Sequence, residues 1–494
     1  MSGLLLLGVA PFVLAYALYR YHQFTGRYPK GPRPMPFIGN ILEFDSKEIH
    51  KILDRVGKKQ QGIYTLFLPM PFVQITDFAI LKEAFVDNGD GFTGRMTSKI
   101  LQEAISFAPN SGVIFSTGDN WKEQRRAAIS ILRDLGMGKN VMEELVITSM
   151  DEYVQYLRMI EDKANVDMRW PIQVMVSNII NEILFGYRYA YDDCKPLIEY
   201  VDAFNDMQKH MDNSTIMTLA ITFPFLTKLP IIGWYTFGRI QREARKINQY
   251  IIDNVHRSLR DQVEGEEATC FVQAYHRKIG QVPYLDETNL FANCADFFLA
   301  GQETVTAILR WALLIFAKHQ DAQEKLRQEV RAAVGADNVP TMADQAKMPY
   351  SRACVLELYR FANVLALNMI HVTTRDVEIR GLPIPEGTWV HGDIHYIMMN
   401  DPVFEKPDEF RPERYIALDG VTMRKELVDK TIPFSVGKRS CAGEGLARVE
   451  LFIGLTATFQ NYKFSPRFGE EIDLEPIPGP VLLPKPHNLC MEPI

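Results

Sequence analysis

The sequence Phe434-Ser-Val-Gly-Lys-Arg-Ser-Cys-Ala-Gly443 decides the fold of this chain. It places one cysteine, Cys441, in a short loop marked by two glycines, directly before an apolar run that is typical of a helix. Glycine permits the tight turn and lets the backbone approach a ligand closely. The N–H groups of a helix start, with the basic neighbours Lys438 and Arg439, favour negative charge on the sulfur. The stretch therefore predicts a thiolate that binds a ligand.

A thiolate held in this way binds haem iron in proteins that must cleave an O–O bond. The ten residues match the pattern F-x-x-G-x-R-x-C-x-G, and the match continues from Pro433 to Arg448, so the chain resembles the cytochromes P-450. The resemblance implies that Cys441 is the axial ligand of the haem iron. It also implies cofactor contacts from Phe434 and Gly443. A buried structural cysteine at a helix start is the alternative interpretation of the loop.

A long apolar stretch, residues 286–318, predicts a helix that carries a second motif, Ala300-Gly-Gln-Glu-Thr304. Gly301 costs about 1 kcal/mol relative to alanine in a helix interior, and one helix face offers a gap beside a hydroxyl. The motif is similar to A/G-G-x-D/E-T of the same family. The resemblance implies that Thr304 hydrogen-bonds bound dioxygen and that Glu303 helps to bring protons to it. A notch for helix packing is the alternative role of the glycine.

The sequence Glu357-Leu-Tyr-Arg360 places a carboxylate and a guanidinium on the same side of a predicted helix. On a protein surface such a pair contributes little to stability. The spacing matches the E-x-x-R motif of the family, and Phe410-Arg-Pro-Glu-Arg414 supplies the family's second arginine. The resemblance implies that Glu357, Arg360 and Arg414 are structural and hold the backbone behind the haem.

Haem carries two carboxylates, so a protein that buries it needs several donors. The sequence Trp121-Lys-Glu-Gln-Arg125 matches the family's W-x-x-x-R, and its indole N–H and guanidinium can both donate to a carboxylate. The resemblance implies that five residues bind the haem propionates: Trp121, Arg125, His371, Arg439 and Arg95. For each of them the alternative is an ordinary solvated side chain.

Eight mostly apolar residues are expected to line the substrate pocket: Ile114, Phe115, Phe297, Ala300, Leu365, Met369, Val481 and Leu482. No cation among them requires a carboxylate on the substrate, so fatty acids and lipophilic foreign compounds are equally compatible. The resemblance is closest to the microsomal animal enzymes that oxidise drugs, steroids and fatty acids. Those enzymes commonly have prolines in the segment that corresponds to residues 361–370, whereas this chain has none.

Charge and cysteine usage exclude several other classes of protein. The net charge of −7 gives no reason to expect nucleic-acid binding. The six cysteines form no CxxC pair and no HExxH motif is present, so zinc and iron–sulfur sites are poorly supported. The chain has no GxGxxG and no second cofactor domain. Its electrons must therefore come from a partner, by resemblance the NADPH–cytochrome reductase, with cytochrome b5 as a further candidate.

Seven basic residues are candidates for a positive face toward the reductase: Lys122, Arg126, Arg133, Lys139, Lys430, Lys438 and Arg448. Ordinary solvated positions are the alternative for each of them.

The N-terminus differs in kind from the rest of the chain. Ser2 to Tyr19 carries no charge and as a helix would reach roughly 27 Å, close to the thickness of a hydrocarbon core. Basic residues follow this run, which favours a cytoplasmic C-terminal side. We therefore expect a membrane anchor over 1–28, a proline-rich hinge over 29–36, and a haem-thiolate catalytic domain over 37–494 that faces the cytoplasm from the endoplasmic reticulum. A cleaved signal peptide is the alternative, but no basic residue precedes the run.

A second apolar segment, Ile216 to Gly238, is interrupted by Pro224 and Pro230, so it is not a regular membrane-spanning helix. We expect it to form a second surface that dips into the membrane. Buried core is the alternative.

Helical patterns dominate, and the chain is expected to be mainly α with small β-sheets, as in the P-450 fold. Helices are expected over 47–57, 77–87, 119–132, 140–160, 171–185, 194–212, 238–262, 286–318, 321–334 and 350–361, and after Cys441. Strands are expected over 62–74, 377–380 and 388–391 and near the C-terminus.

The resulting hypothesis is a haem-thiolate monooxygenase that inserts one atom of O₂ into an apolar substrate and releases the other as water. A haem-thiolate isomerase that rearranges peroxides without a reductase is the second enzymatic hypothesis. A haem sensor or carrier is the non-enzymatic one. Thr304 and Glu303 argue for the first hypothesis, because neither alternative needs protons beside the oxygen site.

Overall fold

The computed structural model describes residues 2–43, 49–68, 70–96, 105–137, 140–210, 224–263, 265–477, 479 and 481–494. The chain forms two compact units, and each is assembled from segments far apart in the sequence. The first unit contains Met1–Met96, Ala366–Asp401 and Ser435–Ser440. The second contains Thr97–Leu365, Pro402–Phe434 and Cys441–Ile494. The predicted boundaries at residues 28 and 36 are not tested by this division and stay a prediction.

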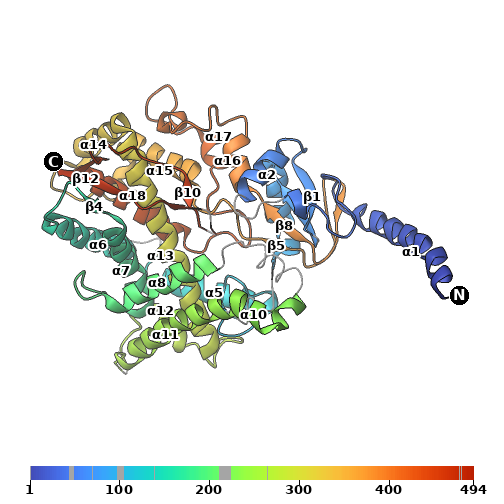
Figure 1. The fold of residues 1–494 in the computed structure, drawn as a ribbon. Coiled ribbons are helices and arrows are strands. Elements are labelled where there is room, and N and C mark those ends of the chain that lie inside the picture. The colour runs from blue at the N-terminus through green and yellow to red at the C-terminus, as the bar shows by residue number, and fades with distance from the viewer. Residues whose placement is uncertain are drawn as a thin grey trace. The chain divides into compact units, whose positions relative to one another are not determined.

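The first unit begins with helix α1 (Ser2–Thr25), which includes the whole uncharged run and continues through Pro11. In Figure 1, α1 projects as a single helix away from the strands of this unit. Phe12 is 78% exposed, and four further large apolar side chains on α1 between positions 13 and 19 are exposed as well. The base of the helix is attached to the unit because the rings of Phe24 and Tyr28 both pack edge-on against Phe67.

Five short strands form the main sheet of the first unit, in the order β1-β2-β8-β5-β3. β2 and β8 pair in parallel, whereas the other neighbours are antiparallel. The register places Arg95 opposite His371, so the sheet brings together two predicted haem-binding residues that are distant in sequence. The bounds are β1 Ile63–Leu68, β2 Met70–Ile75, β8 Trp389–Gly392, β5 His371–Val372 and β3 Gly94–Arg95.

Short helices accompany this sheet. α2 (Ile49–Gly57) packs Leu53 into an apolar cluster with side chains of β1 and β2. The other elements of the unit are η1 Ile41–Glu43, α3 Phe78–Lys82, the π-helical turn η3 Glu83–Asp87, η4 Gly89–Phe92, α16 Ile394–Asn400 and the hairpin of β6 Val377–Ile379 and β7 Leu382–Ile384.

The second unit is built around the long helix α13 (Glu287–Lys318) (Figure 1). The side chain of Asp286 caps its N-terminus by accepting from the Asn289 N–H at 2.7 Å. Apolar residues occur on all sides of α13, as expected for a helix that is buried all round. α7 (Arg169–Phe185) packs closely along it, because a Cβ at Gly301 would lie only 3.2 Å from the Ile180 side chain.

The remaining helices of the second unit are α5 Gly118–Asp134, α6 Asn140–Met159, α8 Lys195–His210, η5 Pro224–Lys228, α10 Pro230–Gly233, η6 Trp234–Gly238, α11 Arg239–Arg260, α12 Phe271–His276, α14 Gln320–Val334, η7 Met342–Lys347, α15 Pro349–Ala362, η8 Pro412–Tyr415, α17 Lys425–Lys430 and α18 Glu444–Asn461. Its strands are β4 Val166–Asp167, β9 Tyr462–Pro466, β10 Pro476–Ile477, β11 Leu483–Pro484 and β12 Asn488–Pro493. β4, β12 and β9 form one sheet, and β10 pairs with β11.

The long predicted helices are present, with ends that differ by at most two residues. The expected helix over 77–87 is instead the short α3 followed by the π-helical turn η3. The expected strand over 62–74 is a tight hairpin of two strands. The elements that the sequence pattern did not predict, such as α12 and α16, are short. An element of so few residues shows too weak a hydrophobic periodicity to be identified from the sequence.

Among the described residues, α13 is long and apolar enough to cross a membrane by length and composition. However, 72% of its apolar window is buried inside the protein. We therefore interpret α13 as a core helix.

The predicted triad of Glu357, Arg360 and Arg414 forms without access to water. Arg360 donates to both carboxylate oxygens of Glu357 at 2.8 Å, and Arg414 Nε donates to Oε1 at 3.1 Å. The backbone N–H of Arg411 donates to the same carboxylate at 2.9 Å, and Arg414 also binds the carbonyl oxygens of Lys406 and Glu409. The triad therefore fixes residues 406–414 against α15.

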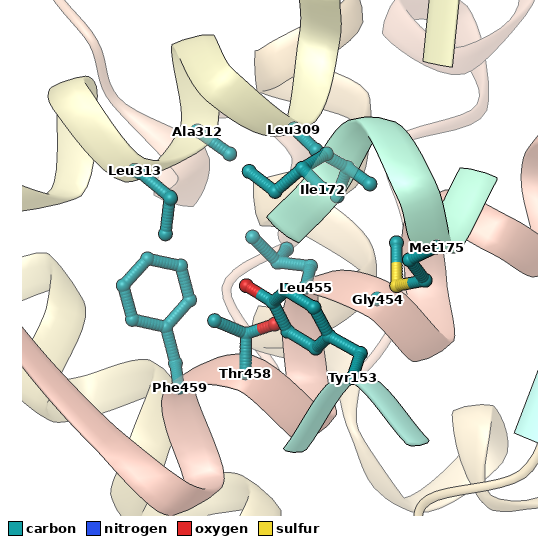
Figure 2. Close-up of a pocket in the computed structure, with 10 residues that line it drawn as sticks. All are labelled: Tyr153, Ile172, Met175, Leu309, Ala312, Leu313, Gly454, Leu455, Thr458 and Phe459. Atoms are coloured by element: carbon teal, nitrogen blue, oxygen red, sulfur yellow. The ribbon is translucent and has the colours of Figure 1, made fainter. Parts of the chain in front are cut away.

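A small cavity lies in the core of the second unit, where α6, α7, α13 and α18 meet (Figure 2). The hydroxyls of Tyr153 and Thr458 hydrogen-bond beside it, and the other lining residues are mainly apolar. It has room for about one water molecule. It is therefore too small for a cofactor or a lipophilic substrate.

Candidate functional site

Cys441 lies between the loop that precedes it and the start of α18. Its N–H donates to the Phe434 carbonyl at 3.0 Å, which closes the loop. Of the six cysteines, Cys441 is the one that is classed as exposed. Nevertheless, desolvation by the surrounding protein raises the pKa of its thiol. Exposure together with desolvation describes a sulfur that is recessed but open to a ligand.

Three groups act against this desolvation and lower the pKa of the Cys441 thiol: the N–H groups of Gly443 and Glu444 at the helix start, and the Arg125 guanidinium. The side chains of Lys438 and Arg439 are engaged elsewhere. Lys438 pairs with Asp90, and Arg439 donates through Nε and Nη2 to the Thr93 carbonyl at 2.9 and 2.7 Å. Within the unit that contains Cys441, the cation that favours the thiolate is Arg125.

The tight turn before Cys441 requires glycine. Gly437 has φ +83°, and a Cβ there would lie 1.9 Å from the Phe85 carbonyl oxygen. The aromatic ring of Phe434 packs edge-on against Tyr359 and under the Arg448 guanidinium. Gly443, by contrast, has open space where a Cβ would project. It serves as the residue before α18.

Three of the predicted propionate donors gather in the first unit. Arg95, His371 and Arg439 are all buried, and both arginines act electrostatically on His371. Arg95 donates weakly to the carbonyls of Met369 and Ile370 at 3.5 and 3.4 Å. Burying like charges together is unfavourable unless an anion offsets them. The cluster therefore fits the binding of carboxylates.

The state of His371 follows from its contacts. Nδ1 lies 2.7 Å from the Phe92 carbonyl, which only accepts, so Nδ1 carries the proton. The ring stacks on Phe85 with centroids 4.0 Å apart. Burial, followed by Arg95, lowers the pKa of His371 well below its usual value. Without an anion His371 is therefore neutral, and a carboxylate at Nε2 would favour its protonation.

The other two predicted donors, Trp121 and Arg125, lie one helical turn apart on α5 of the second unit. Trp121 is buried and Arg125 is half-buried. Desolvation lowers the pKa of Arg125, whereas the nearby Cys441 raises it. The structure therefore places the Arg125 guanidinium within electrostatic reach of Cys441. That Arg125 binds a propionate stays a prediction.

In the middle of α13, the motif residues differ in their accessibility. Ala300 is exposed and Thr304 is half-buried, although the residues that follow Thr304 as far as Leu309 are buried. The Thr304 hydroxyl donates to the Ala300 carbonyl at 2.6 Å. The position of Gly301 is explained by its contact with Ile180, so the glycine serves helix packing. Ala300 and Thr304 are thus accessible residues of the motif.

Glu303 is buried and differs from Thr304 in its surroundings. Its Oε2 atom has no hydrogen-bond partner among the described residues, nor has the hydroxyl of the nearby Tyr200. Desolvation raises the pKa of Glu303, and Arg310 and Arg169 lower it. Buried polar atoms of this kind commonly bind ordered water. The carboxyl group is therefore suited to exchange protons through water.

The predicted pocket residues divide between the units. Met369 belongs to the first, and the other seven belong to the second. Leu482 is held at both ends of its peptide, because its N–H donates to Val364 and its carbonyl accepts from Trp311, each at 2.8 Å. Ile114, Phe115 and Phe297 are half-buried. The residues of the second unit thus include partly accessible apolar side chains, as a pocket requires.

The basic residues expected to face a reductase are largely neutralised by neighbours. Four of them form ion pairs within their own helices: Lys122 with Asp119, Arg126 with Glu123, Lys430 with Glu426 and Arg448 with Glu444. Lys139 lies outside the described residues. The positive face is therefore weaker than a count of basic residues suggests, and its role stays a prediction.

Sequence reasoning missed Asp296, one turn before Ala300 on α13. Its Oδ2 atom accepts from the backbone N–H groups of Val113 and Ile114 at 2.7 and 2.9 Å. It thereby holds the loop that carries Ile114 and Phe115. A carboxylate among apolar helix residues was the available signal, but its partners are almost two hundred positions away and no local pattern identifies them.

In the second unit, a recessed, open cysteine with a cation beside it suits a metal that binds thiolate. In the first unit, two buried arginines and His371 suit carboxylates. Each unit by itself therefore carries residues that fit one part of haem, the iron or the propionates.

Comparison with known proteins agrees with this chemistry. The sequence model of the family described as Cytochrome P450 matches residues 29–491. The chain is 33% identical to Cytochrome P450 2F2 of Mus musculus over 94% of each chain. It is 31% identical to Cytochrome P450 2H1 of Gallus gallus, over 99% of this chain and 98% of that protein. It is 30% identical to Cytochrome P450 2C3 of Oryctolagus cuniculus over the full length of both.

The geometry of Asp296 predicts a pH-dependent stability. Burial raises its pKa from 3.8 to about 7. The folded protein therefore keeps a proton that the unfolded chain releases, and stability falls as the pH rises from about 4 to about 7. Asp296→Asn keeps an oxygen for both N–H groups but does not titrate. The melting temperature of the wild type minus that of Asp296→Asn should therefore decrease as the pH rises from about 4 to about 7.

Asp296→Ala is the matched control, because it removes the acceptor itself. It should lower the melting temperature at every pH and speed amide exchange at residues 112–116. Parallel pH profiles for the wild type and Asp296→Asn would show that the carboxyl does not titrate in this window.

Proposed function

Because the chain belongs to the cytochrome P450 family, and is therefore a haem-binding monooxygenase, we propose that it inserts one atom of O₂ into fatty acids, steroids or xenobiotics. Electrons would come from NADPH through a membrane-bound reductase, with cytochrome b5 as a further donor. The observation that carries this proposal is the recessed, open Cys441 beside Arg125. Its alternatives, an isomerase and a haem sensor, do not explain a buried acid beside the half-buried Thr304.

In this proposal, Cys441 ligates the iron, and Trp121, Arg125, Arg95, His371 and Arg439 bind the propionates. When bound, the haem supplies O₂ activation, which a thiolate ligand favours by donating electron density. The protein contributes Arg125 and the N–H groups at the start of α18, which oppose the effect of desolvation on the thiol pKa and so favour the thiolate.

Proton supply is assigned to Glu303 and Thr304. The raised pKa of Glu303 lets its carboxyl hold a proton at higher pH than an exposed glutamate, and its free oxygen can bind a water molecule. The Thr304 hydroxyl, which donates to Ala300 in the resting chain, can turn to donate at the accessible side of α13. Apolar residues of the predicted pocket would hold the substrate and exclude bulk water.

We further propose that the enzyme resides at the endoplasmic reticulum membrane, with α1 as its anchor and the catalytic part facing the cytoplasm. The described part of the second apolar segment supports an additional membrane contact. Phe225, Leu229, Ile231 and Trp234 are exposed there, Ile231 by 84%, whereas Phe237 is buried. Residues 216–223 of that segment lie outside the described residues.

Replacing Cys441 with serine should abolish the long-wavelength ferrous–carbon monoxide band that a thiolate ligand produces. The reason is that a serine hydroxyl stays protonated and does not donate charge as a thiolate does. Difference spectroscopy of the purified protein measures this band. Cys490→Ser, on strand β12, is the control and should keep the band. A Cys441→Ser protein with an unchanged band would remove the assignment.

Replacing Thr304 with alanine should lower the product formed per NADPH consumed, by roughly tenfold or more if the hydroxyl takes part in proton transfer. Haem content should not change. Thr304→Ser keeps a hydroxyl and is the control that should retain most of the coupling. Mass spectrometry of products from a lipid and drug panel, with NADPH consumption followed in parallel, gives both quantities. Equal coupling in the wild type and Thr304→Ala would contradict the assigned role.

A chain that begins near Pro29 should bind haem with an unchanged spectrum but partition less to membranes, because it lacks α1. Additional polar substitutions of Phe225 and Trp234 should release it further. Polar substitutions of Leu418 and Phe468 are the controls, because both side chains are fully exposed and lie outside the segment. Their substitution should have no effect on sedimentation with vesicles. Full solubility of the truncated chain before these substitutions would exclude the second surface, and undiminished binding would exclude the anchor.

A further inference from the structure

Gln124 forms a hydrogen-bonded junction between three helices of the second unit. It lies on α5 with no exposure to solvent. Its Nε2 donates to the Tyr284 carbonyl at 2.6 Å and to Asn120 Oδ1 at 3.1 Å. Its Oε1 accepts from Tyr275 of α12 at 2.7 Å and from Asn293 of α13 at 2.8 Å. Both donor hydrogens and both acceptor sites of the amide are therefore used.

The same network continues to the loop of residues 110–117. Asn120 Nδ2 donates to the Asn110 carbonyl at 2.5 Å, and Asn110 in turn accepts from the Thr117 N–H at 2.7 Å. Asn289 of α13 accepts from the Gly112 N–H at 3.2 Å and from Asn120 at 3.4 Å. The loop is thus joined to Asn120 by a solvent-exposed hydrogen bond and to Asn289 by a buried one. A displacement of the loop breaks or moves these bonds and thereby changes the position of Asn120, which is itself a partner of Gln124.

The two ends of this network carry the two halves of the proposed site. The loop holds Ile114 and Phe115, which are expected to contact the substrate. Helix α5 holds Trp121 and Arg125, three residues before and one residue after Gln124. Arg125 acts electrostatically on Cys441. A rotation or shift of α5 at Gln124 would therefore move the cation beside the sulfur.

We propose that Gln124 is a positioning residue that couples occupancy of the substrate pocket to the setting of Trp121 and Arg125. This positioning role rests on the proposed function, because it assumes that Ile114 and Phe115 contact the substrate and that Arg125 contacts the haem. In this arrangement a substrate that shifts the 110–117 loop changes the surroundings of the thiolate through side-chain hydrogen bonds, without touching α5. By reciprocity, a change at Arg125 alters the affinity of the pocket by the same factor.

A buried glutamine can also be merely structural, and the chain offers a matched control for that role. Gln323 on α14 is equally buried, and its amide donates to Phe316 and Phe464 and accepts from the Phe464 N–H, at 2.8 to 2.9 Å. These partners are backbone groups of α13 and β9, and none belongs to the 110–117 loop or to α5. Gln124→Leu and Gln323→Leu thus remove comparable networks at different places.

The first measurement is hydrogen exchange on the full-length protein. Asn120→Ala and Gln124→Leu should speed exchange both in residues 110–117 and in the first turns of α5. Gln323→Leu should speed neither. Asn120 is only half-buried, so its variant keeps the test available if Gln124→Leu folds poorly. Exchange that rises equally in all three variants, or only in the loop, would overturn the proposal.

The second measurement is a double-mutant cycle on the haem-loaded protein with Phe115→Ala and Arg125→Lys. The probe is 4-phenylimidazole, whose binding is followed in the haem spectrum. The change in probe affinity of the double variant should differ from the product of the two single changes by about threefold or more, as expected for residues in one network. The Gln323→Leu background should keep this coupling. The Gln124→Leu background should make them additive. Coupling that persists there would overturn the proposal.

The two measurements separate this inference from the proposed function. A protein that binds no haem contradicts the proposed function, while hydrogen exchange still decides whether Gln124 joins the loop to α5. A protein that binds haem and the probe, but shows the same coupling in every background, contradicts only the positioning role.

Discussion

The carboxylate of Glu357 accepts hydrogen bonds from two arginines and a backbone N–H with no access to water. Ion pairs in such a place do not by themselves guarantee stability, because both charges lose their hydration. Removing one partner, however, leaves the other charge buried and alone, which typically costs about 3–5 kcal/mol. The segment of residues 406–414 is held to α15 through these groups. Tyr359, on the same helix α15, packs against Phe434, whose carbonyl accepts from the Cys441 N–H. The position of Cys441 within its unit therefore depends on the helix that this triad anchors.

The cost of burying charge also concerns the candidate functional site, where charged and titratable side chains are desolvated. In the first unit, Arg95, His371 and Arg439 are buried near one another, and both arginines act electrostatically on His371. In the second unit, Cys441 is desolvated yet exposed, with Arg125 acting on it. A structural role favours neutralised and sealed charges, as around Glu357. Side chains whose pKa values are shifted by burial and by neighbouring charges, such as His371 and Cys441, are characteristic of a functional site.

Polar groups inside the second unit divide in a comparable way. The amide of Gln124 is satisfied on all sides, so it can hold α5 and the 110–117 loop in one arrangement. Glu303 has a buried oxygen with no partner among the described residues, so it can hold water and exchange protons. Gln124, whose hydrogen-bonding groups are all satisfied, is thus suited to hold its neighbours in place, whereas Glu303 is suited to proton exchange. Asp296 combines the two, because it fixes the loop through two N–H groups while desolvation raises its pKa to about 7.

The sequence by itself determined the family, the cofactor, the reaction class and nearly all the long helices, because each depends on local order: the spacing around Cys441, and helical periodicity over many residues. Short strands such as β3 and β5 were not predictable, since they exist only through pairing with each other and with β8. Only the tertiary structure decided that Arg125 acts on the sulfur within its unit and that Gly301 packs against Ile180. It also decided that Asp296 and the network of Gln124 hold the loop. The physical reason is common to all of these. A side chain's charge and hydrogen bonds are completed by groups that folding brings near, and adjacency in sequence does not determine which groups those are.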